Sequence, residues 1–531
     1  MSRFPAKACD SPSITMEKGR YRMRAPSAIP LDSLYPLKQP VRRPASRKRD
    51  GPSSLLAALV VLLALACLAS FGFAYYLFTT RWDPAMPHKL HHPDESVQVI
   101  PFDSFKASPR EYHTSEKFLS YLPHSGFHNQ RIALENAIVL GALTNRTVLV
   151  PPIRLGSKPL RYVNSDSLRH DLVLAGKTGL RHCSRLRGHF IPPECLDLHY
   201  THVSPAWLFN LTAIEGFPPL VYLDDLSGHS IHHHLQLPTS EILTLRDLTP
   251  YHYRFIDTTS NTAPFRNKYT ESIYIPTFAR SPHRLIEIGT LFGSSRLRLR
   301  DQNNKRMRTQ VRRSMDFSSP ELVETADAIK TGLGGHYLGA HIRLGDGSFR
   351  ANGETNLRQV WWKLVHEILQ FNISEALYFE RAFRVSSSTE PFEKPTLVAN
   401  TSRHFPLSGF SPSNLRCRGH LHPAPLDRLN NVLFISTDLK NPATDPSFTG
   451  FLHTFPCAFF LSDFSVLLRR LDRLRNEYDG AIMTSFLLPL LDALVVSRAA
   501  VIAGTEGSTF SRFIQDVLWT KHHGLDVVER G

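Results

Sequence analysis

Residues 125–152 read SGFHNQRIALENAIVLGALTNRTVLVPP, and this stretch decides the fold class. It opens with a glycine loop, and apolar residues then recur at helical spacing from Ile132 to Leu143. The apolar run Thr147–Val150 ends at two prolines, as a buried strand does. Three similar strand-like runs follow later in the chain: Tyr337–Ile342, Val432–Ser436 and Ala499–Ala503. Strands separated by helices predict parallel sheets in an α/β architecture.

The formal net charge of +15 comes largely from the N-terminus. Residues 1–50 contain 12 Lys and Arg against 4 Asp and Glu, so the other 481 residues carry only +7. This small excess does not indicate a nucleic-acid partner. Leu55–Phe78 is a run of 24 uncharged residues, long enough to cross a bilayer and too far from the N-terminus for a cleaved signal peptide. A buried helix of a soluble protein is the alternative.

Basic residues within 42–49 precede the apolar run and place the tail in the cytosol. We therefore expect a single-pass type II protein of the Golgi or endoplasmic reticulum membrane, with residues 81–531 in the lumen. Four Asn-x-Ser/Thr sequons follow the span and would be glycosylation sites: Asn145, Asn210, Asn372 and Asn400.

Four of the six cysteines also follow the span: Cys183, Cys195, Cys417 and Cys457. In an oxidising lumen they can form two disulfides. Proximity in the sequence favours Cys183–Cys195 and Cys417–Cys457, although three pairings are open. A zinc site is the competing interpretation, but the sequence contains no CxxC pair.

The part of the chain after the predicted stem has about 420 residues, which exceed one α/β sheet. The 42% hydrophobic content of the 531 residues is typical of a globular protein with a large core. We expect two α/β domains with a cleft between them. The predicted division is a cytosolic tail (1–54), a transmembrane helix (55–78), a luminal stem (79–109), an N-terminal domain (110–325) and a C-terminal domain (326–531). Residues 384–430 are rich in Ser, Pro and Asn, which predicts a surface insertion.

Several common catalytic motifs are missing. The sequence has no P-loop, GxSxG or HExxH pattern. It also lacks an Asp-x-Asp pair, which usually holds a divalent ion against a diphosphate in metal-dependent sugar transferases. We therefore expect no resident metal or cofactor. A bound diphosphate would instead meet cationic side chains and helix N-termini.

Four segments remain, each at the end of a predicted strand or the start of a predicted helix, where α/β proteins bind ligands. They are Ser125–Gln130, His341–Asp346 (HIRLGD), Phe434–Asp438 (FISTD) and Gly504–Ser511 (GTEGSTFS). Arg343 could grip a diphosphate and stabilise a leaving group, or form a structural pair with Asp346. The fourth segment places hydroxyl and N–H groups at a helix N-terminus. Plain helix caps are the alternative for the first and third segments.

Together, in content and in order, these segments resemble the GDP-fucose protein O-fucosyltransferase family. SGFHNQ followed by a helix and NRTVLVPP is similar to that family's glycine-loop signature, and HIRLGD is similar to its HxRRGD element. FISTD and the stretch from Asp492 through SRAAVIAGTEGSTFS resemble its third and C-terminal elements. The resemblance implies a GT-B arrangement of two Rossmann-like domains, the second binding the donor. It also implies inverting transfer of fucose from GDP-fucose without metal.

The resemblance further implies roles for single residues. Arg343 and Asn129 would be catalytic, with Arg343 on the donor diphosphate. The other donor-binding residues would be Gly126, His341, Asp438, Ser508, Thr509 and Phe510. Two positions depart from the family pattern, because Leu344 replaces its second arginine and His128 stands where glycine is usual. The general base is not identified, and His128 and Glu506 are the candidates.

Three functions are compatible with this pattern. The first is a fucosyltransferase that acts on a protein or glycan hydroxyl, the second is a transferase that uses another nucleotide sugar, and the third is an inactive luminal lectin or scaffold. The expected partners are thus a nucleotide sugar, a glycoprotein or glycan acceptor, and the membrane.

Overall fold

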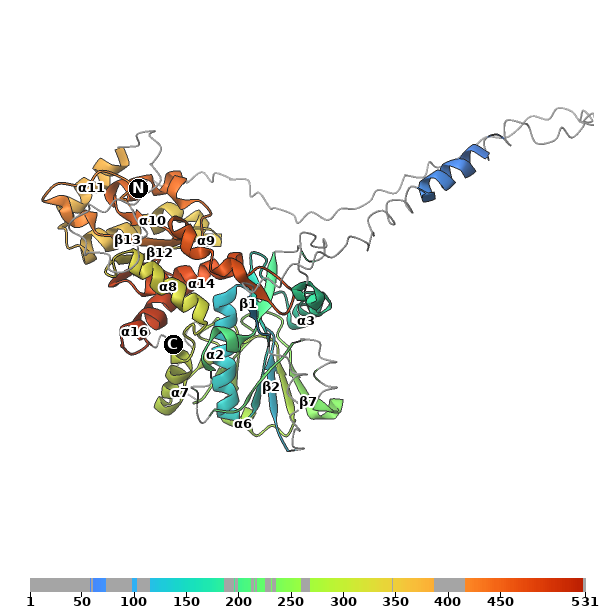
Figure 1. Ribbon diagram of the computed structural model, residues 1–531. Helices are drawn as coiled ribbons and strands as arrows, with labels where there is room; N and C mark the ends of the chain where they lie inside the picture. Colours follow the sequence, from blue (N-terminus) through green and yellow to red (C-terminus); the bar gives the residue numbers. More distant parts are fainter. Residues whose placement is uncertain are drawn as a thin grey trace, which may run out of the picture. The chain divides into compact units, whose positions relative to one another are not determined.

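The computed structural model contains two large sheets of parallel strands (Figure 1). The strands of the first sheet precede residue 325 in the sequence, and those of the second sheet follow it. The chain divides into two units, Met1–His92 and Pro93–Gly531, and both sheets lie in the second unit. The structure describes residues 58, 61–72, 98–102, 115–185, 195, 199–211, 214, 217–224, 231, 235–258, 268–345, 347–385 and 416–528.

The first sheet has five parallel strands in the order β6-β3-β2-β10-β7. They are β2 (Phe118–Tyr121), β3 (Thr147–Val150), β6 (Leu220–Tyr222), β7 (Ile242–Leu245) and β10 (Leu285–Ile288). Because neighbouring residues of a strand face opposite sides, Leu119 packs with α2 (Phe127–Thr144) and Phe118 packs with α3 (Ser165–Leu174). Both faces of the sheet are therefore covered, as in α/β proteins.

Helix α2 carries the glycine loop at its beginning and runs along the first sheet (Figure 1). It starts after Gly126 and ends at Asn145, whose φ of 49° is the left-handed conformation common after a helix. Most of its residues are buried between the sheet and α7 (Gln302–Arg313). The helix and the strand predicted for residues 125–152 are both confirmed.

The second sheet has four parallel strands in the order β14-β13-β12-β16. They are β12 (Leu338–Ile342), β13 (Leu433–Thr437), β14 (Ala458–Phe459) and β16 (Val501–Gly504). One face packs on α10 (Gly353–Trp362), α11 (Ile373–Val385) and α12 (Thr449–Thr454). The other face packs on α14 (Thr484–Ser497). The first two predicted strands here are correct to within one residue, and the third starts later than predicted, at Val501.

Smaller elements complete the second unit. The short strands are β1 (Gln98–Ile100), β4 (Ile153–Gly156), β5 (Tyr200–Val203), β8 (Tyr253–Ile256), β9 (Glu271–Tyr274), β11 (Leu297–Arg298) and β15 (Leu474–Asn476). The other helices are α4 (Pro205–Leu208), α6 (Ile275–Ala279), α8 (Pro320–Gly332), α9 (Gly347–Ala351) and α13 (Ser465–Leu468). A continuous helical run near the C-terminus comprises α15 (Thr509–Phe513), the π-helical turn Ile514–Trp519 and α16 (Thr520–His522).

The two halves share one hydrophobic core. Buried side chains of α2 in the first half and of α8 and α14 in the second belong to the same packed cluster. The expected boundary at residue 325 falls inside α8, which packs against α14. The division into two domains at this point remains a prediction.

The prediction of a stem over 79–109 is wrong in its last part. Residues Gln98–Ile100 form β1, which pairs in parallel with β15. Ile100 and Phe102 are buried, and Phe102 stacks on Tyr478 at 4.5 Å between ring centroids. A three-residue strand is too short to show a period in the sequence, so these residues could not be separated from their polar surroundings.

The predicted insertion over 384–430 is wrong at both ends. Its first residues belong to α11, and residues 416–430 are folded into the second half. In that later part Arg418 is buried and bonded to Asp463 through its guanidinium, while Leu429 lies in the core. The middle of the predicted insertion, 386–415, lies outside the described residues.

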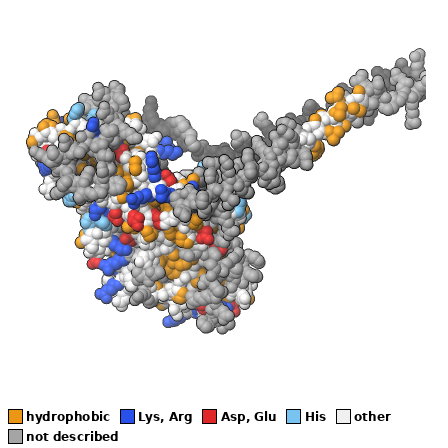
Figure 2. All heavy atoms as spheres, viewed as in Figure 1, with side chains coloured by type: hydrophobic (Ala, Val, Ile, Leu, Met, Phe, Trp, Pro, Cys, Tyr) orange, Lys and Arg blue, Asp and Glu red, His pale blue; other side chains and the backbone are white. Residues whose placement is uncertain are grey.

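In the first unit, the structure describes Ala58 and the helical residues 61–72, which fall within the predicted membrane segment 55–78. Its large apolar side chains are exposed, from Val61 at 59% to Phe71 at 77%, and Figure 2 shows them along the helix. Among the residues that the structure describes, no helix is both long enough and apolar enough to cross a bilayer.

Both predicted disulfides are present, Cys183–Cys195 and Cys417–Cys457. His182 lies beside the first pair, so three possible metal ligands are close together there. The sulfurs of Cys183 and Cys195 are bonded to each other in the disulfide, so neither is a thiolate that could bind a metal. The disulfide interpretation is therefore the one that the structure supports at this place.

Removal of each disulfide should destabilise the protein according to loop length. The sequence separations are 12 and 40 residues, so loop-closure entropy predicts losses of about 3 kcal/mol for Cys183→Ala/Cys195→Ala and about 4 kcal/mol for Cys417→Ala/Cys457→Ala. Urea unfolding of the full chain under non-oxidising and non-reducing conditions measures both values. A larger loss for the shorter loop would contradict the entropic account.

Three of the four sequon asparagines are exposed in the described part of the chain: Asn145, Asn210 and Asn372. Asn372 also caps α11, because its Oδ1 accepts from Glu375 N at 2.8 Å. Asn400 lies outside the described residues. Glycosylation at these positions remains a prediction.

Candidate functional site

The second and third sequence segments meet at the carboxyl ends of two neighbouring strands. Arg343 follows β12 and Asp438 follows β13, and the two strands pair in parallel. Arg343 Nε lies 3.2 Å from Asp438 Oδ2. About one-third of the Arg343 side chain is exposed, so the guanidinium is anchored but accessible. The sequence predicted both residues here, although it named Asp346, which lies outside the described residues, as the alternative partner of Arg343.

Asp438 also binds the backbone of the loop that carries Arg343. Its two carboxylate oxygens accept from Leu344 N and Gly345 N, each at 2.8 Å. A Cβ on Gly345 would lie 2.5 Å from Asp438 Oδ2, so only glycine allows this contact. The expectation was that Asp438 holds the nucleotide directly. In the structure its carboxylate holds the loop that carries Arg343, and its direct contact with a nucleotide remains a prediction.

The fourth segment is tied to the same strand end. The carbonyl oxygen of His341 accepts from Thr505 N at 3.0 Å, and Thr505 Oγ1 accepts from Arg343 N at 3.0 Å. His341 Nδ1 lies 2.6 Å from Ser511 Oγ. Burial, and then the charge of Arg343, lower the pKa of His341 to about 3, so its imidazole is neutral at physiological pH. Sequence reasoning missed Thr505 because its hydroxyl acts between two strands that are distant in the chain.

Ser508, Thr509 and Phe510 begin the C-terminal helical run beside this strand end. Ser508 is buried and caps α15, since its Oγ accepts from Ser511 N at 3.2 Å. Thr509 is exposed and Phe510 is half-buried. The Phe510 ring lies edge-on to His341, with 5.3 Å between centroids. Of these three residues, Thr509 and Phe510 therefore present accessible side chains.

The first segment reaches this place from the other half of the unit. His128, in the first turn of α2, packs against Phe510 at 6.1 Å and Phe513 at 5.4 Å between ring centroids. Gly126 is exposed, and a Cβ built on it would meet no atom within 4 Å. The half-buried Asn129 side chain makes no hydrogen bond with the described part of the chain. The structure thus brings all four segments together, as the sequence predicted.

The two base candidates differ in their surroundings. Burial, then the charges of Arg131 and Arg312, lower the pKa of His128 well below its usual value. Its Nδ1 is buried without a hydrogen-bond partner among the described residues. A base whose pKa lies far below the working pH accepts a proton poorly, which disfavours His128. Glu506 is exposed in the loop before Ser508, where Gly507 adopts a φ of +73°.

A buried carboxylate to which the sequence analysis assigned no role, Asp492, lies behind β13. It lies in the apolar helix α14, is buried, and accepts hydrogen bonds from the Ser436 side chain and the Thr437 backbone just before Asp438. Its Oδ1 has no partner within the described ranges. Burial raises the pKa of Asp492 to about 7. A lone aspartate within the run LLPLLDALVV was the available signal, because Asp is rarely buried unless its carboxylate is paired.

Replacement of Asp492 by asparagine should stabilise the protein above neutral pH. Because the folded-state pKa of about 7 exceeds the unfolded value of 3.8, the contribution of Asp492 to stability is most favourable below pH 4 and falls as the pH rises to 7. At pH 8, Asp492→Asn should gain on the order of 1–3 kcal/mol. Urea unfolding at pH 5 and pH 8 measures the difference, with the exposed Asp472→Asn as control. Equal pH dependence in both variants would contradict this assignment.

A cavity of about 790 Å³ adjoins the site. Leu344 and Leu439, which follow Arg343 and Asp438, line one side of it, and Trp361, Phe383 and Phe451 line the apolar remainder. None of the donor-binding residues expected from the sequence lines this cavity. It is therefore a neighbour of the site at the strand ends and not the same place.

The chain matches no protein-family model. It is 45% identical over 58 residues to O-fucosyltransferase 30 of Arabidopsis thaliana. Within these 58 residues, the chain is similar to an O-fucosyltransferase. The matched segment makes up 10% of this chain and 11% of the plant protein.

Comparison with solved structures also returns fucosyltransferases. An apo crystal structure of POFUT1 gives a TM-score of 0.33 with 10% identity, covering 78% of this chain and 98% of that one. The fucosyltransferase NodZ from Bradyrhizobium gives a TM-score of 0.30 with 13% identity, covering 76% and 94%.

Proposed function

We propose that the chain is a glycosyltransferase that transfers fucose from GDP-fucose to a hydroxyl group of a protein or glycan acceptor. The observation that carries the proposal is the anchored but accessible Arg343, held by Asp438 at the meeting point of the four segments. The choice of donor follows the 58-residue match to a plant O-fucosyltransferase and the family resemblance of the segments.

The proposed reaction inverts the anomeric carbon. The acceptor oxygen attacks C1 of fucose on the face opposite GDP, and the C1–O bond to the β-phosphate breaks with its electron pair leaving on GDP. Arg343 would stabilise the growing negative charge, because a charge-assisted bidentate hydrogen bond is strongest to the leaving diphosphate. The N–H groups at the start of the helical run 509–522 would add to this. The acceptor proton goes to a general base that is not assigned.

The donor would lie between the two halves of the second unit in a GT-B arrangement. The first half would contribute Gly126 and Asn129, and the second half would contribute Arg343, Thr509 and Phe510. The absence of an Asp-x-Asp pair from the sequence supports a reaction without a divalent ion at the diphosphate.

We further propose that residues 55–78 form a membrane helix that holds the second unit in the Golgi or endoplasmic reticulum lumen. The exposed apolar side chains of residues 61–72 support this proposal, since they would be stable in hydrocarbon and not in water. Two disulfides in the second unit are typical of an oxidising compartment.

Calorimetric titration of the full chain with GDP-fucose, GDP-mannose and UDP-N-acetylglucosamine in EDTA tests the proposed function without an acceptor. Selective binding of GDP-fucose is the expected result. Selective binding of another nucleotide sugar would make the chain a different transferase of the same class. If circular dichroism shows folded protein and no nucleotide sugar binds, the luminal lectin or scaffold becomes the leading function.

A further inference from the structure

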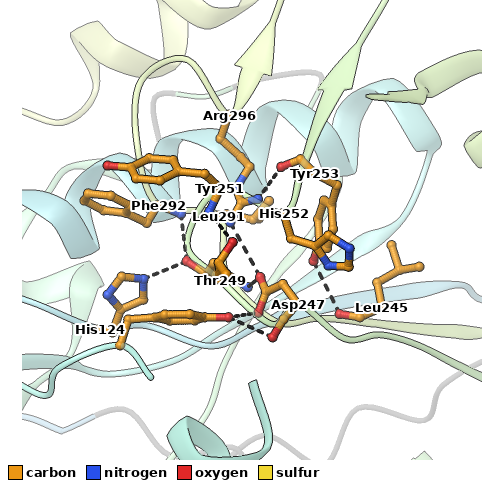
Figure 3. A network of polar contacts seen from close by, with 12 residues as sticks. His124, Leu245, Asp247, Thr249, Tyr251, His252, Tyr253, Leu291, Phe292 and Arg296 are labelled. Atoms are coloured by element: carbon orange, nitrogen blue, oxygen red, sulfur yellow. Dashed lines mark hydrogen bonds and ion pairs between the residues drawn. The ribbon is translucent and has the colours of Figure 1, made fainter. Parts of the chain in front are cut away.

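A buried polar network lies at the carboxyl ends of the first sheet, directly before the glycine loop (Figure 3). His124 follows β2, Asp247 follows β7 and Thr290 follows β10. Asp247 Oδ2 accepts from Thr290 N at 2.9 Å and lies 3.5 Å from Arg296 Nη2, and Tyr162 donates its hydroxyl to Oδ1 of the same carboxylate. The charges inside the network are therefore paired, and Thr290 is held in a fixed position.

The hydroxyl proton of Thr290 has a single destination. Thr290 is fully buried, and its Oγ1 accepts from Phe292 N at 3.0 Å. In the described part of the chain, its only other hydrogen-bond neighbour is His124 Nε2, at 2.7 Å. A buried hydroxyl without an acceptor destabilises the fold by the full desolvation penalty of that group. We therefore assign the Thr290 hydroxyl as the donor to His124 Nε2. The imidazole of His124 consequently carries its hydrogen on Nδ1.

This tautomer sets the direction of the next hydrogen bond. His124 Nδ1 lies 2.8 Å from Ser125 Oγ and must donate to it. Burial, and then the charge of Arg296, lower the pKa of His124 to about 4, so the neutral tautomer persists at physiological pH. Ser125 Oγ thus accepts a hydrogen bond from His124 Nδ1–H, and its own hydroxyl hydrogen remains for a different acceptor.

The backbone of Ser125 is also fixed. Its φ of 65° lies in the left-handed region, which is uncommon for a residue other than glycine. Ser125 N donates to Leu160 O at 2.7 Å, and Ser125 O accepts from Gln130 Nε2 at 3.0 Å. Its side chain is half-buried and stands next to Gly126, over which there is open space. Strain held in place by several hydrogen bonds is typical of a functional position.

We propose that the Ser125 hydroxyl donates a hydrogen bond to the diphosphate of the bound nucleotide sugar, and that Thr290 and His124 are positioning residues that orient its proton. This inference rests on the proposed function, because it needs a phosphate at the start of α2. The relay leaves the Ser125 hydroxyl as a donor, so its partner must offer an oxygen or nitrogen lone pair. A phosphate oxygen meets that demand and forms the stronger, charge-assisted bond.

Calorimetry of GDP and guanosine binding to the full chain tests the relay. Ser125→Ala should raise the dissociation constant for GDP about tenfold or more and leave that for guanosine unchanged, because guanosine has no phosphate. Thr290→Val should lose a part of the GDP affinity, whereas Thr290→Ser, which keeps the hydroxyl, should retain it. Thermal unfolding checks that each variant is folded.

The outcomes separate this inference from the proposed function. If Arg343→Ala weakens GDP binding while Ser125→Ala binds GDP like the wild type, the relay is wrong and the nucleotide site stands. If Ser125→Ala weakens GDP and guanosine equally, its hydroxyl has only a structural role, which also overturns the proposal. If the folded wild-type chain binds no GDP, the proposed function and the relay both fail.

Discussion

Arg343→Ala should remove most of the donor binding and nearly all turnover while the protein stays folded. The guanidinium is anchored by Asp438 and about one-third exposed, so its loss leaves no cavity in the core. A charge-assisted pair contributes about 1.5–3 kcal/mol, which predicts a dissociation constant for GDP-fucose about 10- to 100-fold higher. Loss of a group that stabilises a leaving diphosphate should lower turnover by about 10³-fold.

Two further variants make this prediction specific. Arg343→Lys keeps the charge but loses the bidentate geometry, so its activity should lie between those of the wild type and the alanine variant. Arg350→Ala removes an exposed arginine of the same region and should leave both quantities unchanged. Slow hydrolysis of GDP-fucose to free fucose provides the turnover measurement, since it needs no acceptor. Wild-type hydrolysis by Arg343→Ala would contradict the mechanism.

Glu135→Ala should destabilise the protein by about 3–5 kcal/mol. Glu135 on α2 accepts from Arg312 Nη2 at 2.7 Å and from Arg131 Nη1 at 3.0 Å, and all three side chains are buried. Removal of the carboxylate leaves two buried cations without their shared anion. The same arginine, Arg131, lies over the ring of Phe513 at 4.7 Å, so the variant should also disturb the packing of His128.

The pH dependence of this contribution has the opposite sign to that of Asp492. The two arginines, working against the effect of burial, lower the pKa of Glu135 to about 2. The carboxylate therefore stabilises the fold fully above pH 4.5, and this contribution is lost as the pH falls toward 2. Urea unfolding at pH 7 measures the loss, with the exposed Glu324→Ala on α8 as control. A change below 1 kcal/mol in Glu135→Ala would show that the buried triad does not hold α2 in place.

The sequence predicted the strands and helix that are buried on all sides. Thr147–Val150 and Leu338–Ile342 are short apolar runs inside parallel sheets, and such runs stand out because both of their faces are covered. The same reasoning failed for Gln98–Ile100, which is a strand only because it pairs with β15, far away in the sequence. Pairing between distant segments leaves no local signal.

The candidate site was predicted as a set of segments but not as a set of contacts. Arg343 was correctly placed at a strand end, whereas its partner is Asp438, which approaches from the neighbouring strand. The direction of the Ser125 hydroxyl depends on Thr290, which is 165 residues away in the chain and reached through His124. Such partners become visible only when the order of strands in the sheet is known.

A crystal structure of the full chain with bound GDP would test the central claim most directly. The account predicts that diphosphate oxygens lie within hydrogen-bond distance, about 3 Å, of the Arg343 guanidinium and next to Gly126 and Thr509. GDP bound elsewhere, for example in the cavity lined by Trp361 and Phe451, with Arg343 still paired only within the protein, would contradict it.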